Sequence, residues 1–430
     1  MDPSLMRQAA FRYVAGAMAV AANLTLVACG GGEQASGDFD GDVKVGILHS
    51  RSGTMAISEN TVAEAELMAI DEINAKGGVL VNGKKLKIVP IEEDGASDWP
   101  TFAEKAKKLI DRDQVVVVFG GWTSASRKAM LPVIEAKDHF LFYPIQYEGQ
   151  ECSRNIFYSG AAPNQQAEPA VDWLLKNKGK DFFLVGSDYV YPRTANMIMK
   201  EQLKVKGGNL VGEDYLPLGQ SEVTPIIAKI KQALPRGGVI VNTLNGDSNV
   251  AFFKRMQESG ITPARGYSIM SFSIAEEEIA AIGPQYLEGS YAAWNYFQSL
   301  DTQASKKFTR SFKAKYGENR VTNDPAEAAY TMVYLWAAAA EKANSVDDNK
   351  VREALIGVSF EAPEGKVTVH PNHHVEKLVL IGEVQKDGMF KILENKGFVK
   401  PLAWNQYVPE TKGYSCDWTQ KRPDAGKFKM

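Results

Sequence analysis

The chain is poor in the two residue types that most often hold metals, with three cysteines and five histidines among 430 residues. After residue 29 it also lacks an apolar run that could span a bilayer, which takes about 20 residues. Residues 333–340 are apolar, but the run is short and lies between Glu327 and Glu341, so it predicts a buried helix. The formal net charge is −3 and no basic patch stands out, which argues against nucleic acid as a partner.

The motifs of common enzymes are absent as well. There is no G-x-S-x-G, H-E-x-x-H, Walker loop or G-x-G-x-x-G in the sequence. His370, His373 and His374 form a cluster in a turn without a nearby cysteine, and we predict no metal site there. Asp94 and Asp98 bring oxygens into another loop, where a structural calcium ion is an alternative to the solvated turn that we favour. We therefore predict a binding protein that requires no cofactor, not an enzyme.

The N-terminus has the arrangement of a signal peptide. Two arginines precede an apolar stretch, residues 13–27, which is too short to span a bilayer comfortably. The sequence Leu-Val-Ala then leads into Cys29, and this resembles a bacterial lipobox, in which the cysteine is lipidated and becomes the new N-terminus. We predict a signal peptide over residues 1–28, a lipidated tether over residues 29–41, and a body held outside the membrane. An ordinary signal peptide that contains a cysteine is the alternative.

If Cys29 carries lipid, Cys152 and Cys416 remain. An even pair of cysteines outside the cytoplasm suggests a disulfide, which would tie the C-terminal tail to the middle of the chain. Two buried free thiols are the alternative. The mature chain has about 400 residues, which is too long for one hydrophobic core, so about two domains are expected.

Strands and helices alternate along most of the chain. We expect strands over residues 43–48, 85–91, 115–119, 140–143, 182–186, 210–216 and 239–242, and helices over 61–76, 101–111 and 124–136 and from residues 164, 192, 223 and 247. Alternation of this kind predicts βαβ units and parallel sheets. The wholly apolar strand 115–119 fits a sheet covered on both faces. Residues 304–357 are mainly helical and 365–398 return to strands, so we predict two doubly wound α/β lobes.

Ligands of open parallel sheets bind beyond the carboxyl ends of the strands, so the strand-to-helix junctions are candidate sites. The first junction has a Gly-Gly turn, Trp122 at the loop tip, and Ser124, which we expect to cap the next helix and which could also bind a ligand oxygen. The second junction begins at Tyr143 and continues through Ile145 and Gln146. These residues would enclose a small polar solute.

Two further junctions add aromatic and acidic groups. Tyr189 and Tyr191 lie two residues apart in a loop before Pro192, so both rings could face one ligand if that loop is extended. Packing between the lobes is the alternative for these rings. Asp247 begins the helix that follows the strand expected over residues 239–242. Capping that helix is the better explanation for Asp247, and contact with ligand N–H groups is the alternative.

At these junctions the sequence resembles the type I periplasmic binding proteins of the branched-chain amino acid and amide group, most nearly the urea receptors of ABC transporters. The most specific stretches are residues 123–129, 143–149, 162–165, 186–193 and 242–249. The resemblance implies that Ser124, Tyr189 and Tyr191 contact a bound amide and that Tyr143 lines the site. Trp122 and Ile145 depart from the amide sensors, which argues against acetamide as the ligand.

The resemblance also implies two lobes joined by several crossovers, near residues 160, 291 and 358. We expect a first lobe of residues 42–160 and 292–358, a second lobe of 161–291 and 359–400, and a tail of 401–430. The expected protein is a lipid-anchored receptor that captures urea between its lobes and delivers it to the permease of an ABC transporter. Receptors for short-chain amides or branched-chain amino acids are the alternatives.

Overall fold

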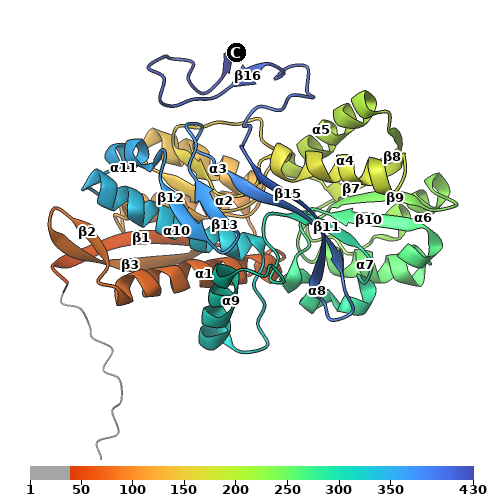
Figure 1. Cartoon of the computed structure of the whole chain (residues 1–430), viewed down its shortest axis with the longest axis horizontal. Helices are drawn as coiled ribbons and strands as arrows, with labels where there is room; N and C mark the ends of the chain where they lie inside the picture. Colours follow the sequence, from red (N-terminus) through yellow and green to blue (C-terminus); the bar gives the residue numbers. More distant parts are fainter. Residues whose placement is uncertain (1–38) are drawn as a thin grey trace, which may run out of the picture. The chain divides into compact units, whose positions relative to one another are not determined.

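Two large β-sheets with helices packed on them make up most of residues 39–430, the part of the chain that the computed structural model describes (Figure 1). The predicted signal peptide and Cys29 lie outside the described residues. Within residues 39–430, no helix combines the length and the apolar character that crossing a membrane requires.

The first sheet has the strand order β2-β3-β1-β4-β5-β6. Its strands are β1 (Gly41–His49), β2 (Val79–Val81), β3 (Lys84–Asp94), β4 (Val118–Gly120), β5 (Leu141–Tyr143) and β6 (Ile156–Tyr158). All neighbours pair in parallel except β2, which is antiparallel to β3. Parallel strands need crossover helices, and the helices of this lobe supply them.

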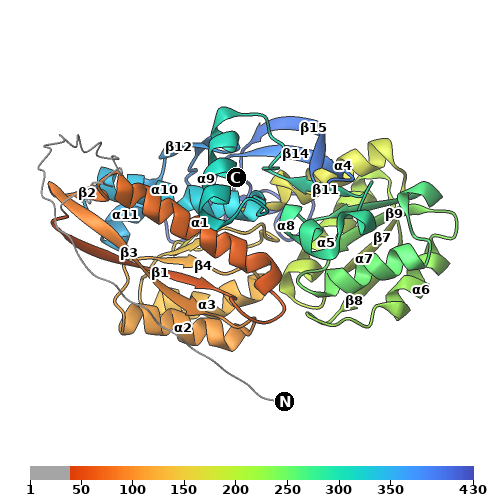
Figure 2. The ribbon, with the colours of Figure 1, turned by 90° about the horizontal axis from the view of Figure 1, so that it is seen from below.

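Those helices are α1 (Ala56–Ala75), α2 (Trp99–Asp111), α3 (Ser124–Ala136), α9 (Gln303–Tyr316), α10 (Asp324–Ala343) and α11 (Asp348–Leu355). Figure 2 shows α1 on one side of this sheet and α2 and α3 on the other. Residues 333–340 fall within α10, most of whose side chains are buried, so the prediction of a buried helix is confirmed.

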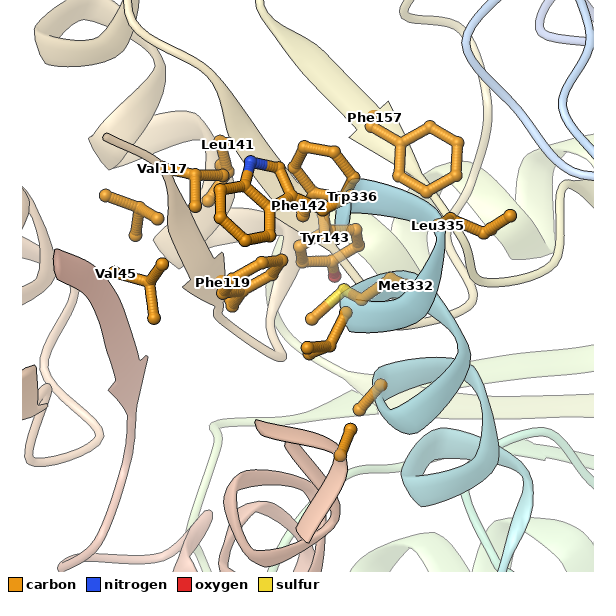
Figure 3. Packing of buried hydrophobic residues seen from close by; sticks show 14 of the residues in the cluster. Val45, Val117, Phe119, Leu141, Phe142, Tyr143, Phe157, Met332, Leu335 and Trp336 are labelled. Atoms are coloured by element: carbon orange, nitrogen blue, oxygen red, sulfur yellow. The ribbon is translucent and has the colours of Figure 1, made fainter. Parts of the chain in front are cut away.

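Aromatic side chains fill the centre of the first lobe (Figure 3). The ring of Phe119 meets those of Phe142 and Trp336 edge-on, with centroids 5.4 and 6.0 Å apart. Edge-to-face contacts of this kind add stabilisation beyond the buried area. They hold the carboxyl ends of β4 and β5 against α10, and those ends carry candidate site residues.

The second sheet has the order β15-β14-β11-β10-β9-β7-β8. Its strands are β7 (Asp181–Ser187), β8 (Asn209–Leu216), β9 (Gly238–Thr243), β10 (Tyr267–Ser271), β11 (Tyr291–Trp294), β14 (Lys377–Val384) and β15 (Phe390–Val399), and its helices are α4 (Ala167–Asn177), α5 (Val190–Lys206), α6 (Thr224–Ala233), α7 (Ser248–Glu258) and α8 (Glu276–Ile282). β14 and β15 are antiparallel to their neighbours and the rest are parallel. The predicted fold class, two doubly wound parallel-sheet lobes, is confirmed.

Two of the expected lobe boundaries differ from those observed. The first crossover lies between β6 and α4, near residue 160 as expected. The second was placed at 291, but β11 pairs with β10 and β14, so the chain leaves the second sheet only after Trp294. The third was placed at 358, but β12 (Ser359–Ala362) and β13 (Gly365–Thr368) bury Ala362 and Val367 in the core of the first lobe. The return to the second sheet comes at Lys377, where β14 begins.

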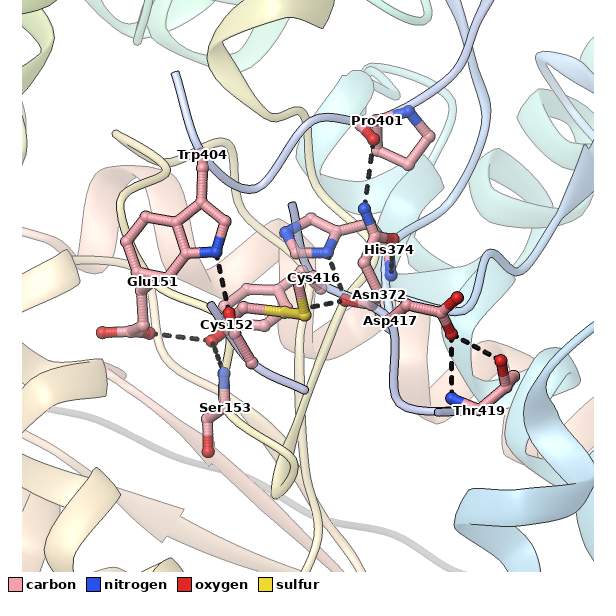
Figure 4. Close-up of a disulfide and its surroundings, with 12 residues drawn as sticks. Glu151, Cys152, Ser153, Asn372, His374, Pro401, Trp404, Cys416, Asp417 and Thr419 are labelled. Atoms are coloured by element: carbon pink, nitrogen blue, oxygen red, sulfur yellow. Dashed lines mark hydrogen bonds between the residues drawn. A yellow bond between two sulfur atoms is a disulfide. The ribbon is translucent and has the colours of Figure 1, made fainter. Parts of the chain in front are cut away.

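The C-terminal tail, residues 401–430, touches both lobes. A disulfide joins Cys152 to Cys416 with the Cα atoms 6.5 Å apart (Figure 4). The carbonyl of Ala403 accepts the N–H of Gln150 in the first lobe at 2.8 Å. Asn405 donates to the Glu168 carboxylate of α4 at 2.6 Å, so the tail is also fixed to the second lobe.

Candidate functional site

The predicted residues come together where the carboxyl ends of β4 and β5 meet those of β7 and β9. We call this region the interlobe seam, and it comprises Trp99, Trp122, Ser124, Tyr143 and Gln146 of the first lobe and Tyr189, Tyr191, Asn245 and Ser273 of the second. All of these except Trp99, which is partly exposed, are buried. Direct hydrogen bonds cross the seam at several points, so the described conformation is closed.

The sequence suggested that Ser124 caps α3, and this prediction is wrong. Thr123 does so instead, because its hydroxyl accepts the N–H of Ser126 at 3.0 Å. Ser124 is the first helical residue, and its hydroxyl donates to the Glu148 carboxylate at 2.5 Å and accepts from Arg127 at 2.9 Å. The sequence missed this because Ser and Thr are both favoured at N-caps, and only the backbone angles decide between neighbours.

Arg127 is fully buried and its charge is matched by two carboxylates. Its guanidinium lies 3.0 Å from Glu148 and 2.8 Å from Glu151, and Glu151 also pairs with Lys128 at 2.6 Å. Burial alone would raise the pKa of Glu151, but Arg127 and Lys128 outweigh it and lower that pKa to about 2. The rings of Tyr143 and Tyr147 cover the guanidinium at 4.9 and 4.8 Å. The two cations and two anions leave this cluster with no formal net charge.

Trp122 connects the end of β4 to the second lobe, and Tyr143 holds Trp122 in place. The Tyr143 hydroxyl donates to the Trp122 carbonyl, which fixes the loop after β4. The Trp122 indole N–H in turn donates to the side-chain oxygen of Asn245 in the second lobe at 3.1 Å. Trp122 thus serves closure, and its ring is 2% exposed.

Gln146 makes the second direct bridge across the seam. Its amide nitrogen donates to the Phe272 carbonyl at 2.7 Å and lies 3.2 Å from the Ser273 hydroxyl. Its amide oxygen is buried and has no partner within the described chain. Ile145 is buried next to Gln146 in the chain. The Ile145 backbone packs closely on Gly160: a Cβ atom at position 160 would lie 2.1 Å from the Ile145 carbonyl carbon.

Tyr189 and Tyr191 face each other with ring centroids 6.4 Å apart. The extended loop that the sequence suggested is absent, since α5 begins at Val190 and Tyr191 lies in its first turn. The rings still gather at the seam, where the Tyr191 hydroxyl approaches the Ser273 and Gln146 side chains. Burial raises the pKa of both tyrosines well above the usual value, so the hydroxyls stay neutral donors.

Asp247 is the predicted residue that fits the site least. It occupies the N-cap position of α7, but its side chain makes no capping bond and is exposed. Its backbone N–H approaches the carbonyl and hydroxyl of Thr54 in the first lobe at 3.3 and 3.2 Å. Gly246 beside it has a φ of +66°, and a Cβ there would lie 2.7 Å from the Thr54 carbonyl oxygen. This junction therefore closes the lobes through its backbone.

Neither of the loops considered for metals gathers a ligand set. Within residues 39–430 there is no group of three or more His, Cys, Asp or Glu side chains that could hold a metal ion. Asp94 accepts from the Ser52 hydroxyl at 2.7 Å, and Asp98 accepts from the Thr101 N–H at 3.0 Å as the cap of α2. His374 bonds to the Tyr147 hydroxyl at 2.6 Å. These side chains are engaged in holding loops.

Several residues of the site were not identified from the sequence. Arg127 and Glu148 were missed although they lie within the singled-out stretches, and Glu151 lies two residues beyond one of them, because charged side chains there also fit a solvated surface. Asn245 lies within the stretch 242–249 and Trp99 begins the helix after β3, but neither was given a role, because only the approach of the two lobes decides which side chain each one contacts. No local pattern carries that information.

Most of the chain is similar to known periplasmic binding proteins. The family model described as a periplasmic binding protein domain matches residues 43–410. A protein of Brucella suis biovar 1 named Leu/Ile/Val-binding protein homolog 7 is 25% identical over 380 residues, or 81% of this chain and 90% of that protein. A limonene hydroxylase of Geobacillus stearothermophilus is 31% identical over 130 residues, but these are 30% of this chain and 24% of that protein.

Solved structures share the fold. A solute-binding protein of an ABC transporter from R. palustris, in complex with benzoate, has a TM-score of 0.74 at 19% identity and covers 84% of this chain and 98% of that one. A branched-chain amino acid transporter substrate-binding protein from Streptococcus pneumoniae, in complex with isoleucine, has a TM-score of 0.71 at 20% identity, over 84% and 100% of the two chains. The chain belongs to the periplasmic binding protein family and has its type I fold.

Proposed function

We propose that this protein is an extracytoplasmic, lipid-anchored receptor that captures urea in the interlobe seam and delivers it to an ABC permease. The observation that carries the proposal is the amide oxygen of Gln146, which is buried and has no hydrogen-bond partner within the described residues, together with the buried neutral rings of Tyr189 and Tyr191 around the same seam. A buried polar group without a partner costs about 1–3 kcal/mol, so a ligand whose N–H bonds to the Gln146 oxygen gains affinity.

The buried charges next to the seam favour a neutral ligand. Arg127 is the buried cation there, and Glu148 and Glu151 already neutralise it. A carboxylate ligand would have to displace one of them and leave a buried charge unpaired, which is expensive. Urea has no charge to compensate.

Urea also matches the available donors and acceptors. It has four N–H donors, one carbonyl and almost no apolar area, so its affinity must come from hydrogen bonds in a site that excludes water. In the pose that we propose, its N–H groups face the Gln146 amide oxygen and the Glu148 carboxylate, and its carbonyl accepts from a tyrosine hydroxyl. The Ser124 hydroxyl, which is engaged by Glu148 and Arg127, orients the carboxylate.

A receptor for branched-chain amino acids is the second candidate, because relatives named Leu/Ile/Val-binding homologues match 81% of the chain. It needs groups for a carboxylate and an ammonium. The Glu148 carboxylate could hold the ammonium, but the Arg127 guanidinium would have to leave a carboxylate partner to hold the ligand carboxylate.

Short-chain amides carry an alkyl group in place of one NH2 group of urea. They would contact the same Gln146 amide oxygen and tyrosine hydroxyls.

Calorimetric titration of the mature protein with urea, acetamide, leucine and benzoate tests the proposal. We expect saturable binding of one urea per chain, weaker binding of acetamide, and none of benzoate. Tyr189→Phe and Tyr191→Phe locate the site, because loss of a hydroxyl that bonds urea should weaken affinity about ten- to a hundredfold. Tight leucine binding without urea binding would establish the second candidate instead. The anchor is tested separately, since Cys29→Ala should abolish acyl labelling.

A further inference from the structure

Trp99 belongs to the first lobe but packs on the second. It is the first residue of α2, and its backbone is fixed there by the Asp98 cap, whose carboxylate accepts the Thr101 N–H at 3.0 Å. Its ring nevertheless lies against the aromatic cluster of the second lobe, with its centroid 6.0 Å from that of Tyr189 and the planes inclined by 45°. The indole therefore reaches across the seam from a rigid helix end.

The indole N–H of Trp99 is buried and unpaired. It has no hydrogen-bond partner within the described residues, as is also the case for Trp418 in the C-terminal tail, whereas the indoles of Trp122, Trp294 and Trp404 donate to Asn245, Ile274 and Gly426. The Tyr189 ring packs against the Trp99 indole, and burial keeps the Tyr189 hydroxyl neutral by raising its pKa well above the usual value. One carbonyl oxygen accepts two hydrogen bonds, so a ligand carbonyl is the acceptor that suits the buried Trp99 N–H and a neighbouring tyrosine hydroxyl.

We propose that Trp99 determines ligand specificity: its ring walls the seam against Tyr189 and its N–H donates to the ligand carbonyl. The inference rests on the proposed function, because it concerns the same seam. The ligand class that it selects is a small carbonyl compound whose substituent on the Trp99 side is no larger than an NH2 group. A larger substituent would have to displace the indole from Tyr189 and open the lobes.

Two substitutions separate the wall from the hydrogen bond. Trp99→Phe keeps an aromatic ring and removes the N–H, and we expect urea affinity to fall about tenfold with the ratio of N-ethylurea to urea affinity little changed. Trp99→Ala removes the wall, and we expect that ratio to rise about tenfold or more. Trp173→Phe is the matched control, because Trp173 packs on Tyr291 within the second lobe at 5.0 Å and should leave both affinities unchanged.

Titration of the mature protein with urea and N-ethylurea decides between the outcomes. The inference is wrong, and the proposed function stands, if the wild type binds urea and both Trp99 variants match it in urea affinity and in the ratio of N-ethylurea to urea affinity. If the wild type binds neither compound, the proposed function fails and the inference fails with it. Thermal unfolding identifies a variant that does not fold; should Trp99→Ala fail, Trp99→Leu tests the wall in its place.

Discussion

Trp122 and Asn245 lie 123 residues apart and are joined by a hydrogen bond of 3.1 Å from one lobe to the other. Both side chains are buried. The bond exists only when the lobes are together, so it contributes to the free energy of closure and not to the folding of either lobe.

Trp122→Phe should therefore weaken ligand binding more than it weakens the fold. It removes the N–H and leaves the Asn245 oxygen without this donor, a loss of about 1–2 kcal/mol in closure, or about five- to thirtyfold in ligand affinity. Trp404→Phe is the control, because the Trp404 indole donates within the tail to Gly426 at 2.8 Å. Calorimetry on both variants checks this. Equal affinity losses in the two would show that the Trp122 bond does not act in closure.

Ser124→Ala should lower stability at least as much as loss of the α3 cap does. The substitution leaves the buried Glu148 carboxylate and the buried Arg127 guanidinium one partner short. We expect the free energy of unfolding to fall by about 1–3 kcal/mol. Thr123→Ala, which removes the true cap, should cost about 1 kcal/mol. Guanidinium chloride denaturation is the proper measurement, because urea is the proposed ligand. A larger loss of unfolding free energy in Thr123→Ala than in Ser124→Ala would contradict the role of the Ser124 hydroxyl as a partner of Glu148 and Arg127.

Glu278 should make stability depend on pH. Burial raises the pKa of this carboxyl to about 7 from 4.5, while Ser58 of the first lobe and the Ala275 N–H lower it only partly, and Glu277 raises it further. The folded protein thus holds the proton to higher pH than the unfolded chain. The group's contribution to stability is present below pH 4.5 and is lost as pH rises through 7.

Glu278→Gln removes this dependence. Relative to the variant, the wild type should lose about 1–3 kcal/mol of unfolding free energy between about pH 5 and about pH 8. Glu258→Gln is the control, since Glu258 is exposed at the end of α7. Denaturation in guanidinium chloride at several pH values gives the difference curve. A curve that is flat, or that rises with pH, would disprove the prediction.

The disulfide should stabilise the fold by about 2–4 kcal/mol. Replacement of both Cys152 and Cys416 by Ser removes the constraint on the unfolded chain. Non-reducing peptide mapping should recover the two cysteines in one linked pair, and reductant should lower the wild-type denaturation midpoint to that of the double variant. Two free thiols in the map, or a midpoint insensitive to reductant, would contradict this.

Alternation of apolar strands and helices was enough to predict two parallel α/β lobes. It could not place the second crossover, because β11 is as apolar as a first-lobe strand would be and only its pairing with β14 assigns it to the second sheet. β13 lies within the region predicted to form strands and β12 just before it, but their attachment to the first lobe depends on where Ala362 and Val367 are buried. Sheet membership is a long-range property.

The site was predictable to the extent that it lies at strand ends. Tyr143, Gln146, Tyr189 and Tyr191 reach the seam because the carboxyl ends of parallel strands converge there. Asp247 was expected to have a side-chain role, yet its backbone makes the contact. Trp99 also follows a strand, β3, at the start of α2, but its contact with Tyr189 exists only when the lobes are closed.

The disulfide has a topological consequence. The whole second sheet lies between Cys152 and Cys416 in the sequence, so it is enclosed in a covalent ring. A protease that cuts one peptide bond anywhere inside this ring leaves two polypeptides that still migrate as one molecule until reductant is added. Damage to an exposed loop of the second lobe would then not release it from the first, and a nicked receptor could still close on its ligand.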